Sequence, residues 1–231
     1  MYKNKKVTAV VPTRKSSQRI KSKNTRAFSD TNLLELKLKV LKKVKNIDNI
    51  IVNTDCPESI KIAKEYGVSI HTRDEYYASS NVTNNVHWRH IAETTDSDII
   101  LLAQTTSPLI KIKTYEDAIE NFLMPDNKFD SINSVSIEKK FLWKDNKPIN
   151  YQYSMTPKSQ DLPDIFSLNF AITIIKKDDM LNYENVVGHN PHFVPLDDIE
   201  ALDVDDMIHF EFAEFMYEKL GFKWFENEKT V

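Results

Sequence analysis

The chain contains a single cysteine, Cys56, among 231 residues. One cysteine can form neither a disulfide within the chain nor a multi-cysteine zinc site. No apolar run is long enough to cross a bilayer, and the opening MYKNKKVTAVV has only a short apolar stretch before Pro12, so we expect no secretory signal and no membrane partner. This composition fits a reducing compartment, and we expect a cytoplasmic protein.

An excess of charge of one sign is also missing. The chain has 31 Lys and Arg residues against 34 Asp and Glu residues, which gives a formal net charge of -3. Such a balance gives no reason to expect nucleic-acid binding or attraction to a membrane surface, so any basic site must be local. No internal repeat, low-complexity tract or long Pro/Gly linker divides the chain, and we predict one domain over residues 1–231.

The first half of the sequence alternates between two hydrophobic periodicities. Runs typical of buried strands are followed by apolar residues at helical spacing, and this order repeats. It predicts a mainly parallel sheet with helices on both faces, an α/β fold. The predicted strands cover residues 6–11, 49–53, 68–71 and 98–103, and the predicted helices cover 33–44, 57–67, 82–94 and 113–123.

After Pro125 the pattern changes. The segments SINSVSI, PINYQYS and SLNFAITII resemble strands joined by polar connections, which predicts an antiparallel extension or a protruding lobe at approximately 130–170. The segment 205–220 is helical again, and its dense aromatic residues predict packing against the sheet.

Polar residues follow each predicted parallel strand. In a parallel sheet, ligands bind beyond the carboxyl ends of the strands, so these residues should form one polar rim. The first of them, VVPTRKSSQRIKSKN at residues 10–24, places Arg and Lys in a turn, where backbone N–H groups and cations suit a phosphate. A solvated basic turn is the alternative. The other rim segments are 53–55, Arg73 and 104–108.

Two carboxylates stand near the far end of the chain, in ALDVDD. Asp203 and Asp205 lie two residues apart, on the same side of an extended backbone, where they could hold a hard cation such as Mg²⁺. The alternative is an acidic helix start, since Asp205 and Asp206 precede an apolar-periodic segment and would favour its dipole.

Five short motifs, in order along nearly the whole chain, resemble those of the cytidylyltransferases that make CMP-sugar acids, especially the CMP-N-acetylneuraminate synthetase branch. The motifs are RKSSQRIKSKN at 14–24, NTD at 53–55, AQTTSPLI at 103–110, NFAI at 169–172 and DVD at 203–205. The resemblance implies a Rossmann-like, three-layer nucleotidyltransferase fold and a homodimer in which a protruding lobe reaches the partner's site. It also implies attack of an acceptor hydroxyl on the α-phosphate of CTP, with release of pyrophosphate, for surface glycan biosynthesis.

The same resemblance implies roles for residues that bind the nucleotide. Arg14 and Lys23 would grip the triphosphate and act as catalytic residues, with Ser17 in the same loop. Asn24 would contact the ribose or the phosphates, and Arg73 would help to position the cytosine.

The remaining implied roles concern the acceptor and the metal. Gln104, Thr106 and Asn169 would contact a small acidic acceptor, and Lys144 in the lobe could supply a cation to it. The pair Asp203 and Asp205 would carry Mg²⁺.

The chain departs from the family pattern at several positions. Lys15 and Ser16 stand where a glycine pair is common, and Phe170 fills a glycine position. Ile110 and Ser167 replace arginines of relatives, and an arginine that pairs with a carboxylate has no conservative substitute. The acceptor therefore stays open between a nonulosonic acid, the octulosonic acid Kdo, and a phosphonate or other phosphorylated molecule. A nucleotide-binding relative without catalysis is a further alternative.

Two histidines, His87 and His90, lie three residues apart on a predicted helix. They could bind a metal in principle, but that helix face offers no acidic partner, so we do not assign them a functional role.

Overall fold

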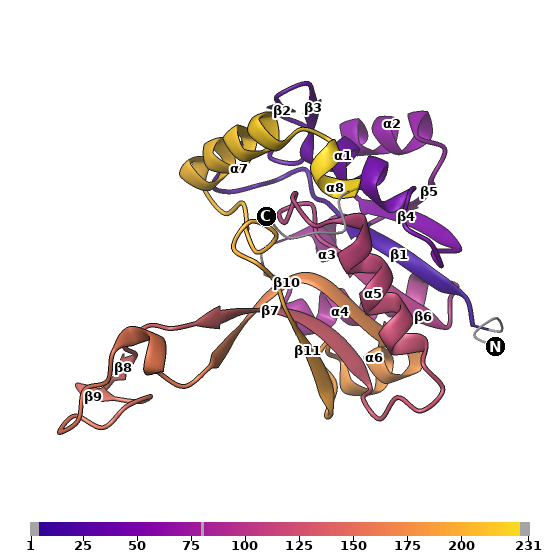
Figure 1. The fold of residues 1–231 in the computed structure, drawn as a ribbon. Helices are drawn as coiled ribbons and strands as arrows, with labels where there is room; N and C mark the ends of the chain where they lie inside the picture. The colour runs from indigo at the N-terminus through magenta and orange to yellow at the C-terminus, as the bar shows by residue number, and fades with distance from the viewer. Residues whose placement is uncertain (1–4, 80, 227–231) are drawn as a thin grey trace.

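The computed structural model describes residues 5–79 and 81–226. Its centre is a seven-stranded sheet in the order β11-β7-β10-β6-β1-β4-β5, in which six strands run in one direction and β10 alone runs antiparallel (Figure 1). The strands are β1 (Val7–Pro12), β4 (Asn49–Thr54), β5 (Ser69–Thr72), β6 (Ile99–Ala103), β7 (Ser131–Glu138), β10 (Ile165–Lys176) and β11 (Pro191–Pro195).

Side-chain alternation along the strands builds two cores, one on each face of the sheet. On β1, Val7, Ala9 and Val11 join the larger core, whereas Val10 belongs to the smaller one, as the period of two requires. The larger core is covered by α1 (Leu33–Leu41), α2 (Pro57–Glu65), α5 (Ile112–Leu123), α7 (Met207–Leu220) and α8 (Lys223–Glu226), and the smaller one by α4 (Asn84–Thr94) and α6 (Lys177–Tyr183). The predicted three-layer α/β fold with a mainly parallel sheet is confirmed.

The segment between β7 and β10 projects from the body of the molecule (Figure 1). The outer half of β10 pairs with the outer half of β7, and the hairpin of β8 (Trp143–Lys144) and β9 (Lys147–Pro148) lies at the far end. The strand predicted for PINYQYS is wrong, because beyond Pro148 this segment consists of bends and turns with one isolated bridge. Polar and aromatic residues alternate there, but within residues 5–79 and 81–226 no neighbouring strand pairs with them.

Three regular elements of the main body were not expected from the sequence, namely α3 (Glu75–Ala78), α6 and β11. The short elements β2 (Ala27–Phe28), β3 (Thr31–Asn32) and the 3-10 turn Ser159–Asp161 complete the fold. The expectation that the aromatics of α7 pack on the sheet holds for Phe210 and Tyr217, which are buried, but is wrong for Phe212 and Phe215, which are about half exposed.

Candidate active site

A cavity of about 570 Å³ lies at the carboxyl ends of the parallel strands, where the sequence predicted a polar rim. Its lining comes from the loop after β1, the α3–α4 region, the end of β6, and β10. Eight of the predicted site residues line it: Arg14, Ser17, Lys23, Asn24, Arg73, Gln104, Thr106 and Asp205.

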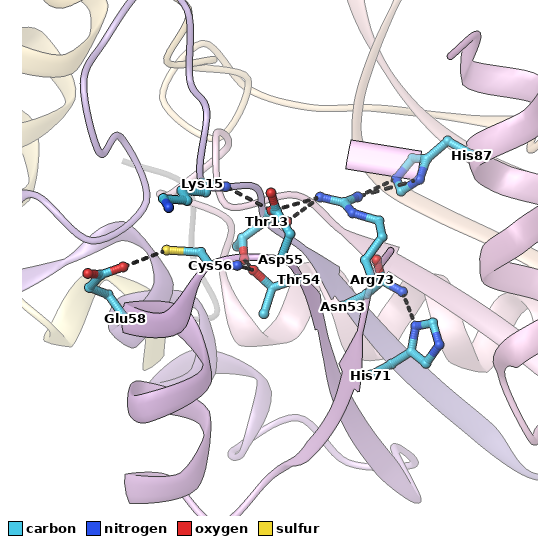
Figure 2. Close-up of polar contacts among 10 residues, drawn as sticks. All are labelled: Thr13, Lys15, Asn53, Thr54, Asp55, Cys56, Glu58, His71, Arg73 and His87. Carbon is cyan, nitrogen blue, oxygen red and sulfur yellow. Dashed lines mark hydrogen bonds and ion pairs between the residues drawn. The ribbon is translucent and has the colours of Figure 1, made fainter. Parts of the chain in front are cut away.

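The start of the basic loop is attached to the neighbouring strand β4. The Thr13 backbone N–H donates to the Asn53 carbonyl over 2.9 Å, and the Thr13 hydroxyl donates to the Thr54 hydroxyl over 2.8 Å. One residue further on, the Lys15 N–H donates to the Asp55 carboxylate over 2.9 Å (Figure 2). The predicted motif at 53–55 therefore holds the basic loop in place.

Arg73 lies beside this attachment and is only 5% exposed. Its backbone N–H extends the β5 end by donating to the Thr54 carbonyl over 2.8 Å, and its guanidinium donates to the Thr13 carbonyl (Figure 2). The Asp55 carboxylate lies 3.9 Å away, too far for a strong pair, and the buried Nε has no partner within the described residues. Burial lowers the pKa of Arg73, while Asp55 opposes that shift.

His87 is a cavity residue to which the sequence analysis gave no functional role. It projects from α4, and Arg73 Nη1 lies 3.1 Å from its Nε2 (Figure 2). Burial, and then the positive charge of Arg73, lowers the pKa of His87 to about 3, so the ring is neutral at physiological pH and can accept this hydrogen bond. The sequence offered one signal for this contact of His87. It was Arg73, directly after β5, because a buried cation needs hydrogen-bond acceptors nearby.

Asn24 joins the basic loop to the end of β6. Its side chain is buried and accepts a hydrogen bond of 2.8 Å from the Thr105 hydroxyl, and its carbonyl accepts from the Leu34 N–H at the start of α1. These contacts leave Asn24 at the cavity wall with a defined orientation.

Lys23 lies beside the acidic pair, of which Asp205 lines the cavity and Asp203 does not. Lys23 Nζ donates to the Val204 carbonyl over 2.7 Å, between the two aspartates, and Arg19 pairs with Asp205 at 3.0 Å. Burial lowers the pKa of Lys23, although Asp203 and Asp205 raise it in part. The pKa of Asp203 is raised, chiefly by burial and further by the like charge of Asp205.

The structure separates the two interpretations of the acidic segment. Asp206 is the N-cap of α7, and its carboxylate accepts from the His209 N–H over 3.0 Å. Asp203 and Asp205 precede the helix and have no capping bond, so the helix start does not account for them. The Val204 N–H donates to the Thr106 carbonyl over 2.7 Å, which keeps this segment beside the loop that follows β6.

Two predicted acceptor residues lie outside the cavity lining. The Asn169 side chain accepts from the Ser134 hydroxyl over 2.6 Å and donates to the Ser136 hydroxyl over 3.2 Å, so it is turned toward β7. Lys144 lies on the exposed β8 hairpin, away from the cavity of its own chain (Figure 1).

The two positions at which relatives carry arginine do not face the cavity either. Ile110 is fully buried in the larger core, and Ser167 is exposed on the outer half of β10, opposite Ser136. Neither side chain is part of the cavity lining.

The fold and the cavity are those of an α/β protein with a cationic loop at the carboxyl end of a parallel strand, as in nucleotide-binding proteins. Comparison with known proteins agrees with this class. Residues 8–217 match the cytidylyltransferase family, and the chain belongs to that family. It is therefore similar in sequence to enzymes that use CTP.

Relatives of established role are distant but extend over the whole domain. The chain is 23% identical to the post-translational flagellin modification protein B of Campylobacter coli, over 91% of this chain and 94% of that protein. It is 22% identical to the CMP-N,N'-diacetyllegionaminic acid synthase of Legionella pneumophila, over 92% and 97%. It is 24% identical to the N-acylneuraminate cytidylyltransferase of Escherichia coli, over 93% of this chain but only 52% of that enzyme.

Solved structures share the fold. A CMP:2-keto-3-deoxy-manno-octonic acid synthetase complexed with CTP superposes with a TM-score of 0.67 at 12% identity, covering 93% of this chain and 99% of that one. A cytidylyltransferase from Leptospira borgpetersenii gives a TM-score of 0.65 at 20% identity, covering 96% and 90%. Among the residues that the structure describes, no helix is long and apolar enough to span a membrane.

Proposed function

We propose that the protein transfers CMP from CTP to a nonulosonic, sialic-acid-like sugar acid and releases pyrophosphate, for surface glycan biosynthesis. The observation that carries this proposal is one cavity lined by cationic side chains of the loop from Arg14 to Lys23 and, beside them, by Asp205. Membership of the cytidylyltransferase family supports CTP as the nucleotide, and the named activities of the relatives support the acceptor class.

The reaction forms a bond between an acceptor hydroxyl oxygen and the α-phosphorus of CTP, and breaks the bond from that phosphorus to the β-phosphate bridging oxygen. The acceptor proton is lost to a base, and pyrophosphate leaves. Negative charge spreads over the phosphate oxygens, so positioned cations stabilise the transition state. Arg14 and Lys23 provide these cations, while Arg73 and Asn24, both held by buried hydrogen bonds, fix the nucleotide end of the cavity.

The acidic pair fits a magnesium ion. Among the described residues there is no cluster of three or more acidic, His or Cys side chains that could enclose a metal. Mg²⁺ does not need one, because it commonly binds through one or two carboxylates together with substrate phosphates. Burial, and to a smaller extent the like charge of Asp205, raises the pKa of Asp203, and a bound cation would oppose both effects by favouring the ionised carboxylate. When bound between Asp203 and Asp205, Mg²⁺ would neutralise triphosphate charge.

A homodimer completes the proposal. The projecting segment carries exposed apolar side chains, and a second copy would bury them. Lys144, exposed in this segment, is then available to the acceptor site of the partner. The exposed residues of this segment and of the outer halves of β7 and β10 are Ile137, Phe141, Trp143, Ile149, Tyr153, Met155, Phe166 and Leu168. A cytoplasmic location, which the lone cysteine favours, stays part of the same proposal.

The deciding experiment measures pyrophosphate release from each of the four nucleoside triphosphates with Mg²⁺ and a panel of acceptors. The panel contains nonulosonic acids, Kdo and small phosphonates. We expect release with CTP and a nonulosonic acid, and loss of at least a hundredfold in kcat for Asp203→Asn, by analogy with the loss of one electrostatic group from an active site. Asp198→Asn, which changes an exposed carboxylate of the same loop, serves as the matched control.

Other results would change the conclusion. Release with Kdo or a phosphonate alone would move the acceptor to that class. Binding of CTP by calorimetry without release with any acceptor would favour a nucleotide-binding relative without catalysis. Failure to bind CTP would refute the assignment of the basic loop.

A further inference from the structure

The order of the strands divides the cavity into two halves. Arg73 follows β5 and the basic loop follows β1, whereas Gln104 follows β6 and Phe170 belongs to β10. In the sheet order β10-β6-β1-β4-β5, Arg73 and the basic loop lie on the side of β1, β4 and β5. Gln104 and Phe170 lie on the side of β6 and β10. We call these the nucleotide half and the acceptor half.

The positive charges of the cavity are confined to one half. The cationic residues of its described lining all come from the nucleotide half, and they are Arg14, Arg19, Lys23 and Arg73. The acceptor half contributes the neutral polar groups of Gln104, Thr105 and Thr106.

Two aromatic rings form the wall of the acceptor half. Trp88 projects from α4, and its ring centroid lies 6.1 Å from that of Phe170. Both rings are partly buried against the smaller core and both line the cavity, so each retains a face that a ligand can contact. We name this pair the aromatic wall.

Phe170 is held in the cavity by an unusual backbone conformation. Its φ of 53° lies in the left-handed region, which is unfavourable for a non-glycine residue. It occurs where the β10–β7 register shifts between Leu168 and Thr173. The Asn169 side chain is held by Ser134 and Ser136 before Phe170, and the Ile172 N–H donates to the Ser134 hydroxyl after it. Strain of this kind persists where the surroundings enforce it, and it gathers at ligand sites.

We infer that the aromatic wall is the specificity determinant for the acceptor, and that it selects a sugar acid with methyl-bearing substituents, such as acetamido groups or a deoxy terminal carbon. This inference rests on the proposed function. The ring faces of the wall carry neither a hydrogen-bond donor nor a cation, so apolar groups of a ligand bind there more favourably than polar ones in an otherwise polar cavity. Each methyl buried against it favours binding by about fourfold, from the transfer free energy of a buried CH₂ group.

The test is a binding series of three acids that differ in methyl content. These are N,N'-diacetyllegionaminic acid, N-acetylneuraminic acid, and the nonulosonic acid with a hydroxyl in place of the acetamido group. Affinities for the CTP-loaded protein are measured by calorimetry and by tryptophan fluorescence. We expect affinity to fall along this series, and the three values to converge in Phe170→Gly and in Trp88→Ala, with CTP affinity unchanged.

Controls separate the wall from general effects. Phe170→Gly relieves the left-handed backbone and so remains informative if Trp88→Ala fails to fold. Val86→Ala alters an exposed residue of α4 outside the cavity lining and should leave the series intact. Fluorescence is measured in a Trp143→Phe background, because the proposed dimer would bring Trp143, next to Lys144, to the partner's acceptor site. In that background the acid-induced change should disappear in Trp88→Phe, because Trp224 is buried.

Three outcomes overturn the inference: an affinity order that survives both wall variants, a loss of CTP affinity in place of acid affinity, or no response of Trp88 to any acid. A series that binds in the expected order without pyrophosphate release has a different meaning. It would refute the proposed reaction while leaving the wall as a selective sugar-acid site.

Discussion

Lys37 offers the sharpest test of the physical reasoning because it is a lysine in the middle of the core. It is 1% exposed on α1, and its Nζ donates to the Ser107 carbonyl and to the Tyr115 hydroxyl, each over 2.7 Å. Ser107 lies in the loop that follows β6, so Lys37 anchors the loop that also carries Gln104 and Thr106. Burial lowers the pKa of Lys37 from 10.5 to about 7, with Glu200 acting in the opposite direction.

The shift defines both the size and the sign of a pH effect. Between pH 7 and 10.5 the unfolded chain carries the Lys37 proton and the folded chain has lost it, so the free energy of unfolding rises with pH by about 1.4 kcal/mol per unit. Below pH 7 both states are protonated and the full cost of about 5 kcal/mol is present. Between pH 7.5 and 9.0 we therefore expect a gain of about 2 kcal/mol from this one residue.

The assay compares the wild type with Lys37→Met by urea unfolding at pH 7.5, 8.25 and 9.0. The variant removes the charge cost but leaves Ser107 and Tyr115 without a partner, at about 1–3 kcal/mol each. We expect the stability of the wild type relative to the variant to rise by about 2 kcal/mol over this range. Lys64→Met, an exposed lysine of α2, controls for the loss of one cation. A difference that stays constant with pH would refute the assignment of a neutral buried lysine.

Two further predictions concern the nucleotide half. Arg73→Lys should weaken CTP binding at least tenfold in calorimetry, because one ammonium cannot replace the fork that contacts both Thr13 and His87; unchanged affinity would show that the fork is dispensable. Arg19→Ala frees Asp205 from an exposed ion pair, so Mn²⁺, used as a paramagnetic probe, should bind up to about fivefold more tightly in spin-resonance titrations. Weaker Mn²⁺ binding would contradict this prediction and would show that Arg19 helps to position Asp205 for the metal.

Much of the fold could be predicted because the first half of the chain obeys simple periodicities. Alternating apolar runs located β1, β4, β5 and β6, and the placement of ligands at strand exits gathered Arg14, Arg73 and Gln104 into one cavity. The missed elements α6 and β11 are short and only partly buried, so their apolar residues give no clear period.

The rest of the site depends on tertiary contacts that no local pattern encodes. Lys37 has the sequence appearance of a solvated lysine, yet it is buried because α1 packs over the Ser107 loop. His87 and Trp88 reach the cavity only because α4 packs on the sheet face that carries the smaller core. The glycine position filled by Phe170 was a visible signal, but its meaning required the left-handed backbone and the ring of Trp88.

β10 has a consequence for how the two copies of a dimer would communicate. Its inner half belongs to the main sheet beside β6, its outer half belongs to the projecting segment, and Phe170 lies at the irregularity between them. A partner that reorients the outer half must act on the backbone that presents Phe170, and an acceptor that stabilises Phe170 must bias the outer half in return. Subunit association and acceptor affinity are then thermodynamically linked. Acceptor affinity would therefore depend on protein concentration, because dilution dissociates the dimer.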